Sequence, residues 1–146
     1  MSFFAKLMGG AKAQINTYSG NRDFLEAVAA ATALVAAADG SIEDEEIVAA
    51  VEAVSHNATL SSVYSPAEIE DEITKQLRKA KTASGRVQLK RELQDVATKE
   101  KQLREDVFLT AVDVATADGE IAPAEQKALD GIAQILGVNA QQLLAA

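Results

Sequence analysis

Two stretches decide the fold of this chain: residues 35–46, with the sequence VAAADGSIEDEE, and residues 114–125, with the sequence VATADGEIAPAE. Both fit the pattern V-A-x-A-D-G-x-I-x-x-x-E. Each stretch follows an apolar segment with helical spacing and precedes another. A glycine in such a place closes the C terminus of a helix. The sequence therefore predicts two related helix–turn–helix hairpins.

Apolar residues predict further helices outward from these turns. They recur every three or four positions, as on one face of a helix, and no segment alternates with the period of two expected of a strand. Alanine, the best helix former, fills 29 positions, against 8 glycines and 2 prolines. We expect an all-α fold, a single compact domain of about six to eight helices. The six main apolar faces are marked by Phe24, Val28 and Val35; Ile47, Val51 and Val54; Ile69, Ile73 and Leu77; Leu89, Leu93 and Val96; Val107, Ala111 and Val114; and Leu129, Ile132 and Leu136.

Several helix ends are also visible in the sequence. Residues 65–68, SPAE, predict a helix start, because Ser caps, Pro fits the first helical position and Glu reaches back. Ser84 and Gly85 are expected to separate two helices in the middle of the chain. Gly137 is expected to end the sixth main helix, and Asn139 to cap a short last one.

Charge is segregated along the chain, which carries 14 basic and 22 acidic residues and a net charge of −8. Residues 23–72 hold 12 acids and no Lys or Arg, residues 75–104 hold 10 bases against 3 acids, and residues 105–130 hold 7 acids and one Lys. The acidic balance suits hard cations or a basic partner, and we expect no nucleic-acid partner. The basic middle is expected to be a solvated helical face, with docking to an acidic partner or to anionic lipid headgroups as the alternative.

The composition also argues against an enzyme. The chain has no cysteine, so disulfides, thiol nucleophiles and thiol redox chemistry are excluded. It has one histidine, His56, and no Gly-rich nucleotide loop. We therefore expect no catalytic residues and no organic cofactor. No apolar run approaches the roughly 20 residues that span a membrane, and residues 1–10 lack the pattern of a secretory signal, so the expected compartment is the cytoplasm.

The two turns carry carboxylates in a pattern partly shared with calcium-binding loops. An EF-hand loop reads D-x-[DN]-x-[DN]-G-x-I-x-x-x-E in its usual form. Its second half matches Asp39 and Glu46 in one copy and Asp118 and Glu125 in the other. Its first half does not match, because apolar or uncharged residues stand where acidic ligands are required. The four carboxylates are candidate ligands for calcium or a similar divalent cation, through two partial loops.

The same turns also have a purely structural interpretation, and both stay open. The glycines close the helices, Ile42 and Ile121 anchor the following helices, and Glu46 and Glu125 lie near the positive ends of helix dipoles. Positions 43 and 122 hold Glu and Ala and not a usual capping residue. A capping box is therefore not expected to account for the two glutamates, and this leaves them available as ligands.

The paired hairpins, the all-helical layout and the first six residues, MSFFAK, resemble the TerB family of tellurite-resistance proteins. The resemblance implies one all-α domain with a duplicated helical unit, in a bacterial cytoplasmic protein of a tellurite-resistance and stress-response gene cluster. It implies association with a TerC-like integral membrane protein and functional ties to calcium-binding TerD-like proteins. It also implies a metal ion at the acidic residues of the two motifs, here Asp39, Glu46, Asp118 and Glu125. The alternative is a metal-independent helical scaffold for protein interactions.

The two copies of the motif differ from each other, and a segment precedes the domain that carries them. Residues 43–46 are all acidic, and Leu34 aligns with Asp113, so the two copies are not chemically equivalent. Residues 21–146 are expected to form the TerB-like domain and residues 1–20 an N-terminal segment with a short amphipathic helix. The apolar side chains of that segment predict docking onto its own domain or peripheral association with the inner face of the membrane.

Overall fold

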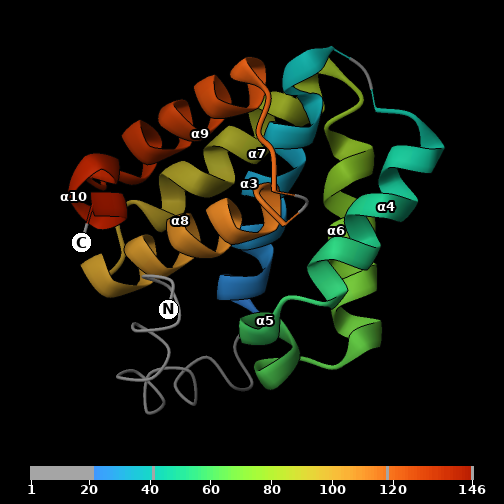
Figure 1. Ribbon diagram of the computed structural model, residues 1–146, viewed down its shortest axis with the longest axis horizontal. Coiled ribbons are helices and arrows are strands. Elements are labelled where there is room, and N and C mark those ends of the chain that lie inside the picture. Colours follow the sequence, from blue (N-terminus) through green and yellow to red (C-terminus); the bar gives the residue numbers. More distant parts are fainter. Residues whose placement is uncertain (1–21, 41, 118, 146) are drawn as a thin grey trace.

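The computed structural model describes residues 22–40, 42–117 and 119–145, with the backbone alone described at Asp39. The helix expected within residues 1–20 lies outside them. The described residues contain no strand, and none of their helices is long and apolar enough to cross a bilayer. The all-α prediction is confirmed (Figure 1). The elements are α3 (Asp23–Ala36), the 3-10 helix η1 (Ala37–Asp39), α4 (Asp44–Ser55), α5 (Ala58–Val63), α6 (Pro66–Lys79), α7 (Ala83–Val96), α8 (Lys101–Ala115), α9 (Pro123–Leu136) and α10 (Ala140–Ala145).

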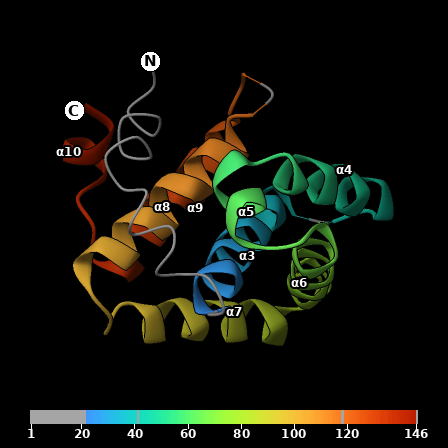
Figure 2. The same ribbon diagram turned by 90° about the horizontal axis from the view of Figure 1, so that it is seen from below.

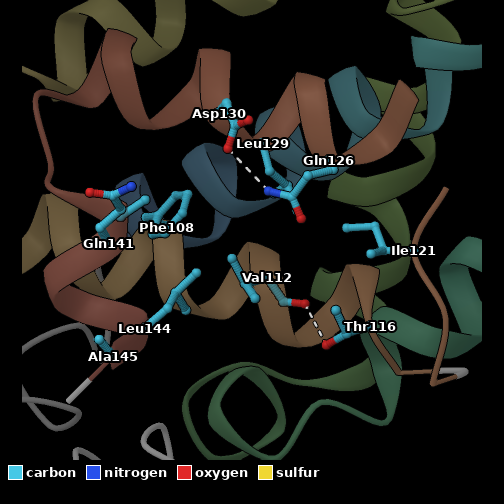
Figure 3. A pocket seen from close by; sticks show the side chains of 11 residues that line it. Phe108, Val112, Thr116, Ile121, Gln126, Leu129, Asp130, Gln141, Leu144 and Ala145 are labelled. Carbon is cyan, nitrogen blue, oxygen red and sulfur yellow. Dashed lines mark hydrogen bonds between the residues drawn. The ribbon is translucent and has the colours of Figure 1, made fainter. Parts of the chain in front are cut away.

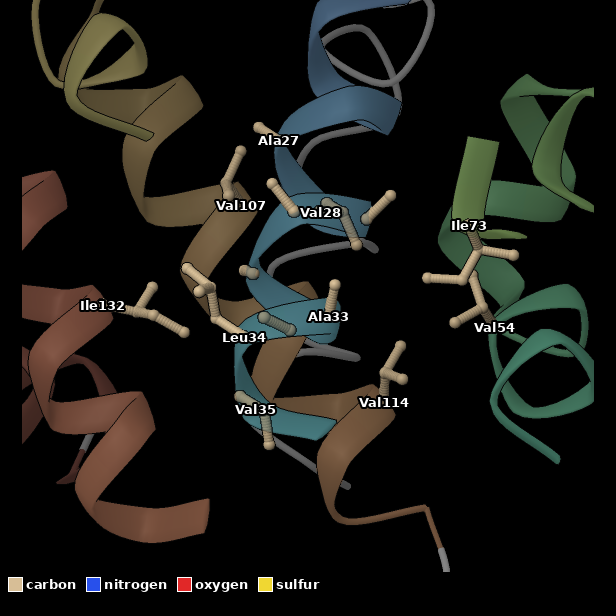
Figure 4. Packing of buried hydrophobic residues seen from close by; sticks show 14 of the residues in the cluster. Ala27, Val28, Ala33, Leu34, Val35, Val54, Ile73, Val107, Val114 and Ile132 are labelled. Atoms are coloured by element: carbon tan, nitrogen blue, oxygen red, sulfur yellow. The ribbon is translucent and has the colours of Figure 1, made fainter. Parts of the chain in front are cut away.

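Helix α3 is the centre of the core. Of residues 24–35, only Glu26 is not buried. A helix that is apolar on every face must be covered on every face, and α6, α7, α8 and α9 all pack against it. Figure 4 shows Val107 of α8 and Ile132 of α9 on one side of α3 and Val54 of α4 on the other. Its many alanines allow these neighbours to approach closely.

Several predicted helix ends are confirmed. Ser65 Oγ accepts a hydrogen bond from Glu68 N (3.2 Å), and Glu68 Oε1 accepts one from Ser65 N (3.0 Å), which completes a capping box at the start of α6. Gly137 ends α9 in the left-handed conformation, with φ 69°. Asn139 Oδ1 accepts from Gln142 N (3.0 Å) at the start of α10. Short-range polar chemistry fixes all three positions.

The basic middle does form two helices, as predicted, but the break lies at residues 80–82 and not at Ser84 and Gly85. Helix α7 already includes both residues, and its cap is Thr82, whose hydroxyl accepts from Gly85 N (3.0 Å). Gly85 allows a close approach between two chain segments: a Cβ there would lie 1.8 Å from the carbonyl oxygen of Lys79. The glycine is therefore required by packing and does not end a helix.

Helix α5 was not predicted as an element. Asn57 Oδ1 accepts from Leu60 N (3.1 Å) and caps this single short helix, whose Thr59 and Leu60 are buried. The segment is rich in Ser and Thr, which have low helix propensity. Its capping residue was the only local signal of a helix.

Part of the basic middle is paired within the fold. Lys81 Nζ lies 3.2 Å from Asp44 Oδ1 of α4, and Lys79 Nζ lies 3.5 Å from Glu92 Oε1 of α7. The Lys81–Asp44 pair is largely solvent-exposed and contributes little to stability, whereas the Lys79–Glu92 pair is partly buried. One pair joins the segment between α6 and α7 to α4, and the other joins α6 to α7.

Candidate functional site at the two acidic turns

The two turns share one backbone geometry. In the first, Gly40 N donates to the carbonyl of Ala37 (3.1 Å) and Gly40 has φ 118°. In the second, Gly119 N donates to the carbonyl of Thr116 (2.9 Å) and Gly119 has φ 88°. These are equivalent positions of the repeat. The positive φ values explain the glycines, because L-residues rarely adopt them.

The glutamate that ends each motif reaches back to the start of its helix. Glu46 Oε1 accepts from the backbone N of Glu43 (3.2 Å), and Glu125 Oε1 accepts from the backbone N of Ala122 (2.9 Å). This corrects the expectation that capping does not account for these residues. The glutamate half of a capping box forms without a Ser or Thr partner, because it needs only the backbone N–H of the capping residue.

Each of these carboxylates retains one oxygen for another role. Among the described residues, no donor lies within hydrogen-bond distance of Oε2 of Glu46 or of Glu125. Both side chains line the same open groove, which has a volume of about 770 Å³. Helix α4 forms one side of this groove, and the end of α8 with the start of α9 forms the other. The two repeats therefore face a common space.

The candidate aspartates are described less fully than the glutamates. Asp39 ends η1 and only its backbone is described, while Asp118 lies outside the described residues. Within the described part of the chain, no three His, Asp or Glu side chains form a group that could hold a metal ion. Thr116 Oγ1, at the third position of the EF-hand pattern, donates to the carbonyl of Val112 (2.8 Å). Its hydroxyl is thus engaged with its own helix.

The family model for "Tellurite resistance protein TerB" matches residues 25–146. The chain belongs to the TerB family. The match includes both acidic turns and every described helix, except for the first two residues of α3. Neither the curated proteins nor the solved structures give a significant match to the chain.

Two residues of this TerB groove were not predicted from the sequence. Glu52 lies on its α4 side, and Thr32 of α3 lines its inner part. The spacing of Glu46, Ala49 and Ala53 does indicate that the three residues share one face of α4, because positions i, i+3 and i+7 of a helix lie on the same side. Nothing in the sequence indicated that this alanine-rich face would line a groove.

The TerB repeats differ next to the second turn. Asp113 of α8 stands where the first copy has Leu34, and the side chain is half-buried. Burial raises the pKa of the Asp113 carboxyl above its usual value. The negative charge of Asp113 is therefore disfavoured in the folded protein. The equivalent residue of the first repeat, Leu34, is buried and carries no charge.

A second pocket of the TerB domain lies between α8, α9 and α10 and has a volume of about 480 Å³ (Figure 3). Phe108, Leu129 and Leu144 give it a mainly apolar lining. Its amide Gln126 donates from Nε2 to Asp130 Oδ1 (3.0 Å), as the dashed line shows. Among the described residues that line this pocket Asp130 is the single acid, whereas Glu46, Glu52 and Glu125 line the α4 groove.

Proposed function

We propose that this member of the TerB family is a non-enzymatic accessory protein that binds divalent cations such as calcium at its two acidic turns. Asp39 and Glu46 form the ligands of one turn, and Asp118 and Glu125 those of the other. The protein acts with a TerC-like integral membrane protein at the inner face of the membrane, together with TerD-like proteins. The family assignment supports the tellurite-resistance context.

One observation carries the cation proposal: Glu46 and Glu125, the last residues of the two motifs, line the same groove with one oxygen each not engaged in capping. Hard cations prefer carboxylate and carbonyl oxygens. Glu52 adds a third negative charge to the groove, and like charges facing a common space concentrate cations.

The described donors fit a weak site better than a tight one. Calcium takes roughly 6–8 oxygen ligands, and the candidate ligands of each turn are one glutamate, one aspartate and backbone carbonyls. Because no described group of three ligands converges, the proposal needs Asp39 and Asp118 to complete the sites. We therefore propose two separate sites, each with an affinity of about 10⁻⁴–10⁻³ M, as in the weakest natural calcium loops.

Backbone-amide NMR during a calcium titration tests this function. Saturable shifts of the Gly40 and Gly119 amides at millimolar calcium are expected, with smaller shifts in magnesium because that ion dehydrates reluctantly. The Asp39→Ala and Asp118→Ala variants are expected to lose the shifts of their own turns. The Glu68→Gln variant is the control, because Glu68 has the same capping role at α6 but lies in neither turn. Unmoved glycines in wild-type protein would overturn the cation proposal.

A metal-independent scaffold is the second candidate function. The observation that favours it is the capping role of Glu46 and Glu125, which gives each glutamate a structural purpose without a cation. In that case the protein would bind its partner equally well with calcium and with a chelator. Co-purification with the TerC-like protein of the same genome, in calcium and in EDTA, separates the two functions.

A further inference from the structure

Most of the groove beside α4 lies outside the two turns. Among the described residues that line it, seven of thirteen are alanine and none is Lys, Arg or aromatic. The alanines come from both sides, with Ala49 and Ala53 on α4 and Ala111 and Ala115 on α8. Small side chains let the backbone of a second helix approach closely. The lining therefore fits an α-helix better than a bulky aromatic ligand.

The charge of the groove has one sign. Glu46 and Glu52 lie on its α4 side and Glu125 on the α9 side, so carboxylates flank the alanines from both directions. Whatever lies on the alanines would place its edges next to these carboxylates. Lys and Arg are the complementary side chains, because their long apolar stems cover the surface while their charges reach the rim.

An unsatisfied hydroxyl lies in the inner part of the groove. Thr32 is 7% exposed, and the structure describes no hydrogen-bond partner for its Oγ1. Leaving a buried hydroxyl unpaired is unfavourable. The Oγ1 atom itself has almost no accessible surface, so an occupant with a Ser or Thr on its contact face would pair with it once the Thr32 side chain turns toward the groove. This observation is independent of the acidic residues and of the alanines.

We propose that the groove is a docking site for one amphipathic α-helix of a partner protein. The contact face of that helix carries small residues with a Ser or Thr, and its two flanks carry Lys or Arg. The inference rests on the proposed role as a partner-binding protein, and it does not depend on the proposed cation.

A designed peptide tests the docking site. The probe is a synthetic helix of about 18 residues, long enough to form a stable helix, with Ala, Leu and Ser on one face and Lys on both flanks. It is titrated into the full chain with labelled alanine methyl groups, in EDTA. Saturable methyl shifts are expected at Ala49, Ala53, Ala111 and Ala115. The exposed Ala67 of α6 is expected to stay unmoved. A peptide of the same composition in scrambled order is expected to bind roughly tenfold more weakly, a loss of about 1.4 kcal/mol.

Two pairs of variants test whether the peptide binds in the groove or is attracted by the negative charge of the whole protein. Ala49→Leu fills the groove and is expected to weaken the peptide roughly tenfold, whereas Ala67→Leu, also on an exposed helix face, is not. Glu52→Lys is expected to weaken it about two- to tenfold. Glu70→Lys, an equal charge change on the exposed side of α6, is expected to have a smaller effect.

Three results would overturn the proposal. The first is the absence of saturable shifts at the groove alanines, and the second is an equal effect of the Glu52 and Glu70 reversals. The third is tighter binding by a peptide of residues 1–20, which carries Lys6 and Lys12 and no acid; the occupant would then be the chain's own N-terminal segment. Because EDTA is present throughout, a failure of the cation sites leaves this test unchanged.

Discussion

The first acidic turn leads into α4, which packs mainly against α6, whereas the second leads into α9, which packs against α8, α3 and α7. Figure 2 shows the consequence from below: α4 and α6 lie together on one side of α3, and α8 and α9 on the other. Two nearly identical turns thus precede helices with different surroundings. The turn motif specifies how the chain reverses, and the apolar face of the next helix specifies what that helix covers.

The difference follows from the sequence after each turn. Helix α4 buries only Ile47 and Val54, and much of its remaining surface is charged or alanine. Helix α9 buries four residues and has a single acid in its first turn. The helix with less apolar surface contacts fewer neighbours. The space that it leaves open toward α8 and α9 is the groove that both motif glutamates line.

Core truncations are expected to give the largest effects and to separate the two repeats. Ile132→Ala in α9 is expected to lower the free energy of unfolding by about 2–5 kcal/mol, because it leaves a cavity at the centre of the core. Ile47→Ala in α4 is expected to lie at the lower end of that range. Urea denaturation measures both. Hydrogen exchange adds a regional test: Ile47→Ala is expected to reduce amide protection in α4 before the rest of the molecule. Equal loss of protection in α4 and α9 would contradict the contrast between the repeats.

Alanine at the turn glycines is expected to have the next largest effect. Gly40→Ala and Gly119→Ala are each expected to cost about 1–2 kcal/mol, because both glycines have positive φ and an L-residue is strained there. A Cβ would meet nothing within 4 Å at either position, so the cost comes from the backbone alone. Gly131→Ala in α9 is the control and is expected to stabilise by about 1 kcal/mol. A stabilising change at either turn would show that the two turns do not share this geometry.

Substitutions of the motif glutamates are expected to separate capping from charge. Glu46→Ala and Glu125→Ala are each expected to cost about 0.5–1 kcal/mol, because each removes an acceptor at a helix start. Glu46→Gln and Glu125→Gln keep an amide oxygen and are expected to retain most of this stability. Thermal unfolding measures the difference. If the Gln variants lost as much as the Ala variants, charge near the helix start would be the main contribution, and the cap a minor one.

The aspartate of the second repeat is expected to give the smallest and most pH-dependent effect. Burial raises the pKa of Asp113, so its ionisation opposes folding once the pH exceeds the unfolded pKa of about 3.9. Asp113→Asn is therefore expected to stabilise at pH 7 by less than about 1 kcal/mol, since the side chain is half-exposed. The gain is expected to disappear below the unfolded pKa, where wild-type Asp113 is also neutral. A gain that persists in acid would assign the effect to packing and not to charge.

Features that depend on residues close together in the sequence were predicted well. Gly40 and Gly119 at positive φ, Ser65 as a cap and Asn139 as a cap all follow from chemistry within four residues. The predicted helix break was displaced at Gly85, because Thr82 already caps α7 and the glycine serves a close approach to the Lys79 carbonyl within the same turn.

The candidate site could be predicted only in part. The motif identified Glu46 and Glu125, but their common groove depends on α4 packing against α6, which involves residues far apart in the sequence. Glu52 and Thr32 were missed for the same reason. A repeat in the sequence shows which residues are equivalent, but it does not show whether equivalent residues face the same space.

A calcium titration of the Glu125→Gln protein, followed at the Gly40 and Gly119 amides together, tests most directly whether each turn holds its own ion. The variant keeps the capping acceptor and removes one carboxylate from the second turn. We expect the Gly119 shift to weaken strongly while the Gly40 shift stays at its wild-type affinity. Loss of both shifts would mean one shared site, and two unchanged shifts would mean that Glu125 is not a ligand. Either result would contradict this account.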